Sequence, residues 1–400
     1  MLAKRFEENP ILKPKGNHFW EAQAVFNGCP VKRRDDIFLA YRAMSLPYYS
    51  CLTGARLSVS SIGLARSKDG LHFASRRRFI FPEHSWERFG CEDPRVTKFS
   101  GKYYIFYTAL SAWPPKAEGI KVGLAISNDL KRVCKKHPVT PFNAKAMALF
   151  PQRIGGKIYA VLSVNTDKPP AKICITSFDK EEDIWSERYW QAWYEDFEKY
   201  ALPLQRRAED QIEVGAQPIK TKSGWLLLYS YIRDYFSKSR ERLLGVEAVL
   251  LDLEDPYKIL GRIEVPMLTP EECYERVGLV PNVVFPSGAL VRRNRLYIYY
   301  GASDTTCCVA STRLPLILWL LLKKPKMLKL QRATENPIIQ PAKEHTWESK
   351  ATFNPAAIYL GGKVHIVYRA MSDDNTSVFG YATSKDGIHI DYRSPEPIYI

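Results

Sequence analysis

Runs of alternating aromatic and aliphatic residues, separated by short turns, dominate the hydrophobic pattern of this chain. Lys102–Thr108, Trp225–Tyr229 and Leu296–Tyr300 are three such runs, and Gly, Ser or Asn residues precede them. Gly63–Ser67 resembles Gly123–Ser127, which follows 60 residues later. Short strands at hairpin spacing with a regular period are typical of a β-propeller. The pattern therefore predicts an all-β fold, a five-bladed β-propeller with blades of about 60 residues.

Two segments interrupt this pattern. Residues 179–207 are rich in Glu, Trp and Tyr, which predicts helix or a long insertion. Residues 314–330 (LPLILWLLLKKPKMLKL) hold an apolar run followed by lysines. That run is too short to span a bilayer, so no stable membrane span is expected. It could lie at a membrane interface, but a helix packed beneath the propeller is the favoured interpretation.

A long-range repeat divides the chain. Glu8–Ile11 recurs as Glu335–Ile338, and Tyr41–Ser45 recurs as Tyr368–Ser372, both at an offset of 327 residues. The pattern predicts a complete propeller domain over residues 1–330. It also predicts that residues 331–400 are the opening segment of a second, truncated unit. One blade cannot close a propeller, so the second unit should pack poorly alone.

Composition and charge narrow the function classes. Hydrophobic residues make up 46% and charged residues 25%, which is ordinary for a globular protein. The formal net charge of +15 is spread over short clusters, and no nucleic-acid-binding motif is present, so no nucleic-acid partner is expected. The eight Cys show no CxxC spacing and the N-terminus has no hydrophobic signal core, which favours a cytoplasmic location. The seven His include no HxH or HExxH pattern, so no metal or other cofactor is expected. The sequence is compatible with either a monomer or a homo-oligomer.

Three motifs carry candidate chemistry. Glu92-Asp93-Pro94-Arg95 places paired acids beside an Arg just before a strand, which suits a polar substrate, although Asp-Pro is also a common turn. Gln211 and Glu213 share one face of a predicted strand, either lining a pocket or facing solvent. The third motif comprises two segments, Pro281–Gly288 and Tyr299–Asp304. They suit a pocket rim with Phe285 as a sugar platform, or a plain turn ending at Asp304.

Taken together, these pieces resemble glycoside hydrolase family 130, five-bladed propeller enzymes that act on β-mannosides. The resemblance covers residues 5–312 in the family's order. It rests on Asn9–Ile11, Phe26-Asn27, Tyr41–Ala43, Glu92–Val96, Leu149–Pro151, Gly224–Leu226, Leu250–Pro256, Gly278–Pro286 and Tyr299–Asp304.

The resemblance implies a role for individual residues. Asp93 would be the general acid that serves the glycosidic oxygen. Asn27, Arg42, Phe285 and Asp304 would surround the mannosyl unit that is cut away, and Arg95 and Gln211 are further candidate substrate contacts. In the family's phosphorylases, inorganic phosphate held by Arg and Lys attacks the anomeric carbon as a co-substrate.

The sequence departs from the phosphorylase pattern at three positions that bind phosphate in the family. It reads Ser163-Val164-Asn165, Gln211-Ile212-Glu213 and Ser230 where phosphorylases carry an Asn-Arg-Pro-like segment, a Lys and a His. Loss of these cations and gain of Glu213 predict an inverting hydrolase. In such an enzyme Glu213 would activate water as general base, roughly 6.5–9.5 Å from the acid.

Two alternatives stay open. A shifted alignment could let Arg153, Lys157, Lys168 or Arg188 hold phosphate, in which case the reaction is phosphorolysis that releases mannose 1-phosphate. A sugar-binding propeller without catalysis is the third interpretation. The oligosaccharide is the expected partner in all three. The Trp residues of the 179–207 insertion are expected to shape the leaving-group side or to form an oligomer contact.

Overall fold

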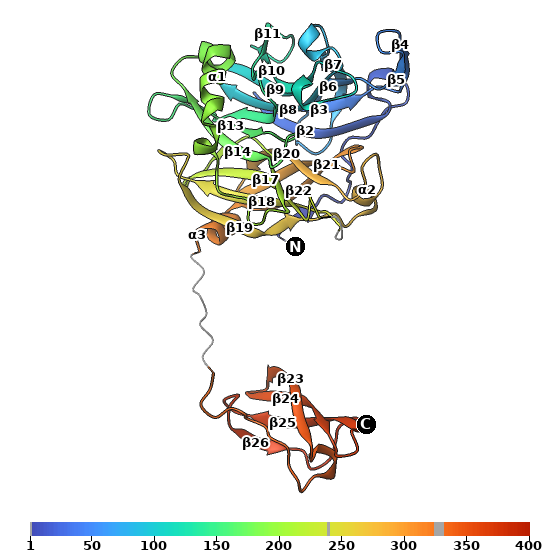
Figure 1. Ribbon diagram of the computed structural model, residues 1–400, viewed down its shortest axis with the longest axis vertical. Helices are drawn as coiled ribbons and strands as arrows, with labels where there is room; N and C mark the ends of the chain where they lie inside the picture. The colour runs from blue at the N-terminus through green and yellow to red at the C-terminus, as the bar shows by residue number, and fades with distance from the viewer. Residues whose placement is uncertain (1, 238–240, 324–331) are drawn as a thin grey trace. The chain divides into compact units, whose positions relative to one another are not determined.

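A computed structural model describes residues 2–237, 241–323 and 332–400 of the chain. The chain divides into two compact units, Met1–Lys324 and Pro325–Ile400. Both are built mainly from antiparallel strands (Figure 1). The prediction of an all-β fold is therefore confirmed.

Successive antiparallel sheets make up the first unit. The first sheet has eight strands in two groups that meet at a single parallel pair, Ser60 with Gly90. The first group is β2 (Ala24–Arg33), β3 (Asp36–Met44), β6 (Ser60–Ser67) and β7 (Ala74–Ile80). The second group is β8 (Gly90–Phe99), β9 (Lys102–Leu110), β10 (Ile120–Ser127) and β11 (Lys135–Pro138). A small hairpin, β4 (Tyr48–Ser50) and β5 (Ala55–Leu57), extends from the connection between β3 and β6.

Three further sheets complete the first unit. One is β12 (Ala144–Leu149), β13 (Ile158–Val164) and β14 (Lys172–Phe178). The next is β15 (Gln211–Val214), β16 (Ile219–Lys220), β17 (Trp225–Arg233), β18 (Leu243–Leu251) and β19 (Ile259–Leu268). The last is β20 (Val284–Arg292), β21 (Arg295–Ala302) and β22 (Thr306–Arg313), joined by β1 (Lys4–Arg5) from the start of the chain. Because β2 also contacts β20, β21 and β22, the first and last sheets of the unit are neighbours (Figure 1).

Buried carboxylates recur at similar places in several sheets. In four cases within the first unit, a Tyr hydroxyl donates to a buried Glu that also pairs with a cation. These are Tyr41–Glu21–Arg76, Tyr107–Glu87–Lys136, Tyr229–Glu247–Arg206 and Tyr300–Glu275–Arg5. Two of these Glu residues end short 3-10 helices, η1 (Phe19–Glu21) and η2 (Ser85–Glu87). A buried charge is tolerated only when it is paired and hydrogen-bonded, so each set ties a strand to the segment beside it.

The segment predicted to interrupt the strands does so. It contains α1 (Glu187–Glu195) between η4 (Glu182–Trp185) and η5 (Phe197–Tyr200). Ser186 caps α1 by accepting a hydrogen bond from the Tyr189 amide at 3.3 Å. Trp190 and Trp193 are buried on the sheet of β12 to β14, so this insertion belongs to the core.

The apolar run near residue 314 forms α3 (Leu314–Leu322), with Pro315 in its first turn. Ile317 and Leu321 are buried against β18, β19 and β22, so the helix packs on the first unit. The remainder of the predicted segment, residues 324–330, lies outside the described residues. Among the described helices, which also include α2 (Cys273–Arg276) and η3 (Ala117–Gly119), none is long and apolar enough to cross a membrane.

The second unit repeats the first group of strands. Its single sheet is β23 (Ala351–Leu360), β24 (Lys363–Met371), β25 (Ser377–Ser384) and β26 (Ile390–Arg393), preceded by η6 (Thr346–Glu348). Tyr368 donates to buried Glu348 at 2.8 Å and Arg393 pairs with the same carboxylate at 2.7 Å. Strand β23 is largely exposed, Ile358 to 63%, whereas its counterpart β2 is buried by neighbouring sheets. The sequence repeat is therefore also a structural repeat.

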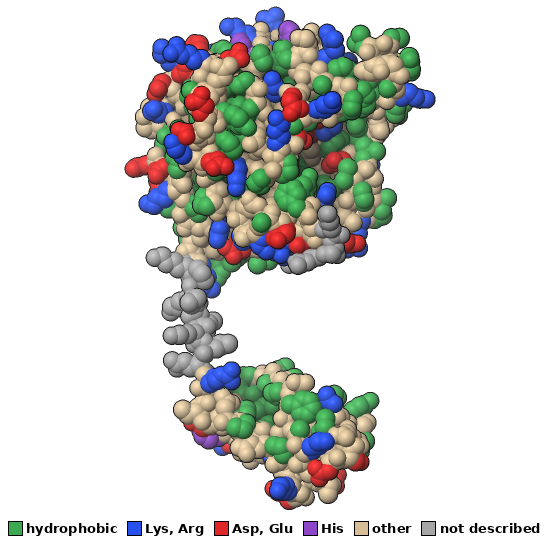
Figure 2. All heavy atoms as spheres, in the orientation of Figure 1, with side chains coloured by type: hydrophobic (Ala, Val, Ile, Leu, Met, Phe, Trp, Pro, Cys, Tyr) green, Lys and Arg blue, Asp and Glu red, His purple; other side chains and the backbone are tan. Residues whose placement is uncertain are grey.

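Charged side chains are mixed over the visible face. Lys and Arg lie interspersed with Asp and Glu on both units in Figure 2. Such a distribution matches the scattered basic clusters of the sequence.

Candidate active site

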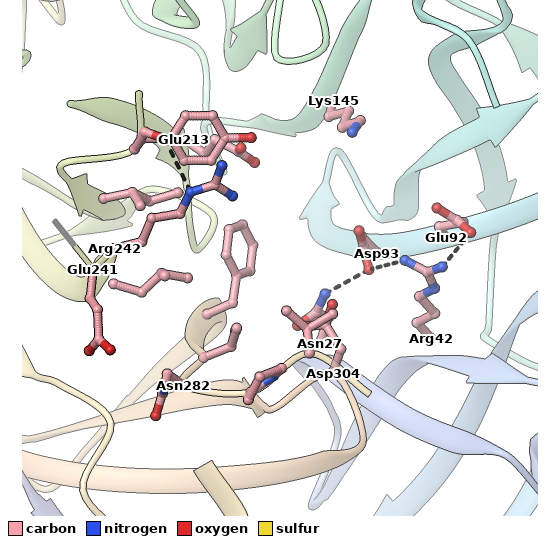
Figure 3. Close-up of a pocket in the computed structure, with 17 residues that line it drawn as sticks. Asn27, Arg42, Glu92, Asp93, Lys145, Glu213, Glu241, Arg242, Asn282 and Asp304 are labelled. Atoms are coloured by element: carbon pink, nitrogen blue, oxygen red, sulfur yellow. Dashed lines mark hydrogen bonds and ion pairs between the residues drawn. The ribbon is translucent and has the colours of Figure 1, made fainter. Parts of the chain in front are cut away.

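Six of the predicted residues line one cavity of about 600 Å³ in the first unit. They are Asn27, Arg42, Asp93, Glu213, Phe285 and Asp304. They come from β2, β3, β8, β15, β20 and the turn after β21, so residues more than 270 positions apart in the sequence share one site. Figure 3 shows Asn27, Arg42, Asp93, Glu213 and Asp304 around an open centre, with Asp93 and Glu213 on different sides of it.

The strands that carry the key polar residues are bulged at the same place. Register shifts occur in β2 around Asn27, in β8 around Asp93 and in β12 around Ala146. All three residues have a positive φ, between 50° and 52°. This backbone conformation costs a non-glycine residue about 1–3 kcal/mol and is concentrated at functional sites. The bulges re-aim Asn27 and Asp93, which then meet where β2 contacts β8, although β3 and β6 separate these strands in the sheet order.

Asp93 is held by two neighbours through one oxygen. Asn27 Nδ2 donates to Asp93 Oδ1 at 2.7 Å, and Arg42 Nη1 lies 3.6 Å from the same oxygen (Figure 3). Both contacts described for this carboxyl end on Oδ1. The second oxygen is therefore left for a ligand, in a position to hold or release a proton beside the cavity.

Glu213 lies in a different electrostatic setting. Burial raises the pKa of its carboxyl, while the positive charge of Lys145 and a hydrogen bond from Gln211 Nε2 at 2.9 Å act in the opposite direction. Burial alone would lower the pKa of Lys145, but Glu213 and Asp167 together raise it. Lys145 pairs with Asp167 at 2.9 Å, so it stays charged near Glu213. A half-buried carboxylate with a raised pKa suits a proton acceptor at near-neutral pH.

A chain of acids and one Arg forms the opposite wall. Arg42 Nη2 donates to Glu92 Oε1 at 2.5 Å, and Ser60 donates to the same oxygen at 2.9 Å. Burial raises the pKa of Asp304 to about 6; Arg42 opposes this shift and Asp93 adds to it. Burial also raises the pKa of Glu92, against the pull of Arg42.

The acids outnumber the cations at the cavity. Its lining includes the acids Glu92, Asp93, Glu213, Glu241 and Asp304 and the cations Arg42, Lys145 and Arg242. Arg42 and Lys145 are already engaged with carboxylates. A neutral polyol meets hydrogen-bonding groups here at no charge penalty, whereas a dianion meets an excess of negative charge.

The positions that depart from the phosphorylase pattern gather around Glu213. Glu213 is opposite Ser230 in the register of β15 and β17. Gln211 donates a hydrogen bond to the Glu213 carboxylate. Ser163 Oγ accepts from the Val214 amide at 2.7 Å, next to Glu213 in the chain. Asn165 lies farther along, with its side chain accepting from Tyr194. Side chains without positive charge therefore surround Glu213 at these positions.

Two predicted substrate contacts do not reach the cavity. Arg95 is 0% exposed and lies behind the wall, where it donates to the backbone carbonyls of Asp93 at 3.1 Å and Gly215. Gln211 is also buried and contacts Glu213 instead of the open space. Both residues are shielded from a ligand. Arg95 binds the backbone of Asp93 and Gln211 binds the side chain of Glu213, so each is placed to position one of the two carboxyls.

Several lining residues were missed from the sequence. Glu92 lay in the predicted motif but was given no role, although it contacts Arg42. Lys145 directly precedes the bulged residue Ala146, just as Glu92 directly precedes the bulged residue Asp93. This equivalence of the two positions was the signal that could have identified Lys145. Tyr235 lies in the turn after β17, and Glu241 and Arg242 directly precede β18. The sequence around them has no periodic pattern, so nothing in it indicated these residues.

The tryptophans expected near the leaving group are elsewhere. Trp190 and Trp193 are packed in the core, and Trp185 stacks on His137 with ring centroids 4.2 Å apart. None of the three lines the cavity. These tryptophans do not form a wall of this cavity, because the insertion covers one sheet instead. The alternative, that the insertion forms an oligomer contact, stays a prediction.

The acids of the cavity do not form a metal site. Within the described ranges, no group of three or more His, Cys, Asp and Glu side chains could hold a metal ion. What the arrangement offers is a proton donor, a proton acceptor and hydrogen-bonding groups around a polar ligand.

Comparison with known proteins gives one consistent family. Residues 3–323 match the model of glycoside hydrolase family 130, described as β-1,4-mannooligosaccharide phosphorylase. The chain is 33% identical over 309 residues to a 1,2-β-oligomannan phosphorylase of Thermoanaerobacter sp. strain X514, covering 77% of this chain and 96% of that protein. It is 29% identical to a β-1,4-mannooligosaccharide phosphorylase of Ruminococcus albus, covering 62% of this chain and 71% of the relative.

A solved structure agrees with these matches. The β-1,2-mannobiose phosphorylase of Listeria innocua, in complex with β-1,2-mannobiose, superposes with a TM-score of 0.66 at 26% identity. The match covers 80% of this chain and 99% of that chain. The sequence match and the structural match therefore cover the same part of the chain, the first unit, and both point to the same family.

Proposed function

This chain belongs to glycoside hydrolase family 130 and is an enzyme of glycoside cleavage, and we propose that it cleaves terminal β-mannosidic bonds of manno-oligosaccharides. Asp93 is the proposed proton donor to the glycosidic oxygen. Asn27, Arg42, Phe285 and Asp304 are the proposed contacts of the mannosyl unit that is cut away. The observation that carries this proposal is their convergence on one cavity with Asp93 held through a single oxygen.

Water is the acceptor that the charges of the site favour. Glu213 is half-buried at the cavity wall and interacts with the positive charge of Lys145. The neighbouring positions Gln211 and Ser230 carry only uncharged side chains. In an inverting hydrolase one carboxyl protonates the leaving oxygen while the other removes a proton from the attacking water. Glu213 is the proposed general base for that water. Arg95 and Gln211 act on this account as positioning residues for the two carboxyls.

Phosphate is the second candidate acceptor, and the names of the relatives favour it over water. The relatives from Thermoanaerobacter, Ruminococcus albus and Listeria innocua are all named as phosphorylases. Arg242 would then be the cation with the most freedom to hold the anion, because its described partners are the Tyr235 carbonyl and ring. The product would be mannose 1-phosphate. We rank this second because the five acids of the cavity would repel a dianion.

The arrangement of sheets supports a five-bladed propeller for residues 1–330. Counting the two groups of the first sheet separately gives five groups of strands, and the last is completed by β1 from the start of the chain. On this proposal the bulged strands β2, β8 and β12 are innermost and their bulges face the axial cavity. Residues 331–400 then correspond to the first blade of a second unit.

Replacement of Asp93 by Asn tests the shared part of both candidates. Asn keeps the size of the side chain but cannot donate the catalytic proton to the leaving oxygen. Turnover of mannobiose should fall about 10²–10⁴-fold. An aryl β-mannoside with a phenolate leaving group of low pKa should lose much less, since it needs little protonation. Equal losses on both substrates would contradict the assignment.

A further inference from the structure

One side of helix α3 is apolar and uncovered. Ile317 and Leu321 on the inner side are buried, whereas Leu316, Trp319 and Leu322 on the outer side are 40%, 54% and 46% exposed. The three exposed residues are spaced by three positions, so they form one continuous strip along the helix. A helix that is apolar on all sides is normally buried on all sides. The outer strip of α3 is therefore a surface that fits an apolar partner.

The helix is fixed in this orientation. Gly261 of β19 lies so close to α3 that a side chain at this position would collide with the Leu321 carbonyl. At the start of the helix, the Leu314 amide donates to the Asn294 carbonyl at 2.9 Å. Figure 1 shows α3 at the margin of the first unit, beside β19. The outer strip is thus held on the surface of this unit.

Exposed cations lie at both ends of α3. Arg293 and Arg295 belong to the turn between β20 and β21 that holds the first helical residue, and Arg295 lies opposite Arg313 in the register of β21 and β22. Lys323 follows the helix, with its Nζ 4.5 Å from the centroid of the Trp319 ring. The ion pairs among the described residues include none of these four cations. Like charges directly opposite each other destabilise a sheet, so this surface favours an anion.

The acids on the strands packed against α3 are already paired. Glu264 of β19 pairs with Arg262 at 2.7 Å, and buried Glu247 of β18 pairs with Arg206 at 2.7 Å. The sequence has no Asp or Glu at positions 305–334. The surface around α3 therefore combines an apolar strip with a net positive charge.

This combination matches the surface of an anionic lipid bilayer. Trp and Leu side chains enter the boundary between headgroups and acyl chains, and Arg and Lys side chains attract anionic headgroups. A nucleic acid would match the cations but would leave the apolar strip uncovered. An uncharged protein groove would cover the strip but would leave the cations unpaired. The nine residues of α3 are too few to cross a bilayer, so the helix would lie along its surface.

We propose that the outer strip of α3 and its four flanking cations bind the surface of a membrane that contains anionic lipids. Leu316, Trp319 and Leu322 enter the headgroup region, and the cations contact lipid phosphates. None of these seven residues lines the candidate active site, so the proposal is independent of the proposed function.

The test is flotation of the full chain with vesicles of phosphatidylcholine that contain about 30% phosphatidylserine, and with vesicles of phosphatidylcholine alone. Binding to the anionic vesicles should be at least about ten-fold stronger, and it should weaken between about 0.1 and 1 M salt because the charges are screened. Trp319→Ala should weaken binding about ten-fold, since the largest apolar side chain of the strip is lost. Arg295→Gln should weaken it about five-fold.

Matched variants remove the same kinds of side chain elsewhere. Tyr49→Ala removes an aromatic side chain that is 64% exposed on the β4–β5 hairpin. Lys116→Gln removes an exposed cation between β9 and β10. Both should bind the anionic vesicles like the unmodified chain. Far-UV circular dichroism should show that Trp319→Ala keeps the fold, since Trp319 lies on the surface.

Four results would overturn the proposal. The first three are absence of binding to the anionic vesicles, equal binding to both kinds of vesicle, and unchanged binding of Trp319→Ala. The fourth is a dimer of the unmodified chain in solution that Trp319→Ala dissociates, which would make the outer strip of α3 an interface between two copies.

Discussion

Glu213 is the residue on which the choice of acceptor depends, and Glu213→Gln is the sharpest perturbation of it. Gln keeps the shape of the side chain and can still bond to Gln211, but it cannot take a proton from water. Loss of a general base lowers turnover by about 10²–10⁴-fold, or about 3–5 kcal/mol of transition-state stabilisation. The assay is release of reducing sugar from mannobiose under saturating substrate.

The same substitution should not unfold the protein. Burial raises the pKa of Glu213, so its ionised form is disfavoured in the folded chain relative to water. A neutral amide removes that cost, and the thermal midpoint should stay the same or rise. Lys145 loses one negative neighbour but keeps its ion pair with Asp167 at 2.9 Å. Loss of activity without loss of stability would therefore isolate the chemical role.

A matched variant and a rescue complete the experiment. Glu241→Gln changes another acid of the cavity that has no proposed role, and it should keep turnover within about three-fold. In Glu213→Ala, added azide should restore cleavage and give α-mannosyl azide, because the anion attacks from the side of the missing base. Turnover of Glu213→Gln within a few-fold of the unmodified chain would refute the assignment of Glu213 as base.

Three further predictions concern pH, packing and the second unit. The pKa of Asp304, about 6 against an ordinary 3.8, means that the folded chain holds this proton more tightly than the unfolded chain. The free energy of unfolding therefore falls as pH rises between these values, by up to about 3 kcal/mol, and Asp304→Asn should remove that component in urea unfolding at pH 4.5 and 7. Tyr107→Phe should lower the free energy of unfolding by about 1–2 kcal/mol, because buried Glu87 loses a donor; an unchanged urea midpoint would contradict this. Residues 1–324 alone should keep the kcat/KM of the full chain, since all residues lining the catalytic cavity lie in the first unit; a loss above about three-fold would show that the second unit contributes.

Local pattern was enough for much of the fold. Alternating runs and turns predicted the strands because each strand buries one or both faces and ends at a turn. The recurrence of Tyr41–Ser45 as Tyr368–Ser372 predicted the second sheet, and both copies place their Tyr hydroxyl on a buried Glu. The irregular segment 179–207 was correctly separated from the strands, but its packing partners were not predictable, since its aromatics are buried by residues distant in sequence.

The site was predicted where a motif coincided with a bulge. Asp93 and Asn27 stand in motifs and also at bulges that turn them toward the cavity. Arg95 shares the motif of Asp93, yet it lies behind the wall, because motif membership does not say on which side of a strand a side chain emerges. Lys145 and Arg242 were missed because single cations outside motifs acquire meaning only from neighbours that the fold supplies.

The most direct test of the central claim is product analysis of the unmodified chain with β-1,2- and β-1,4-linked mannobiose, in the presence and absence of inorganic phosphate. If water is the acceptor, free mannose forms at the same rate in both conditions, and the α-anomer forms first because water attacks with inversion. Mannose 1-phosphate formed only when phosphate is present would contradict the role of Glu213 and establish phosphate as the acceptor.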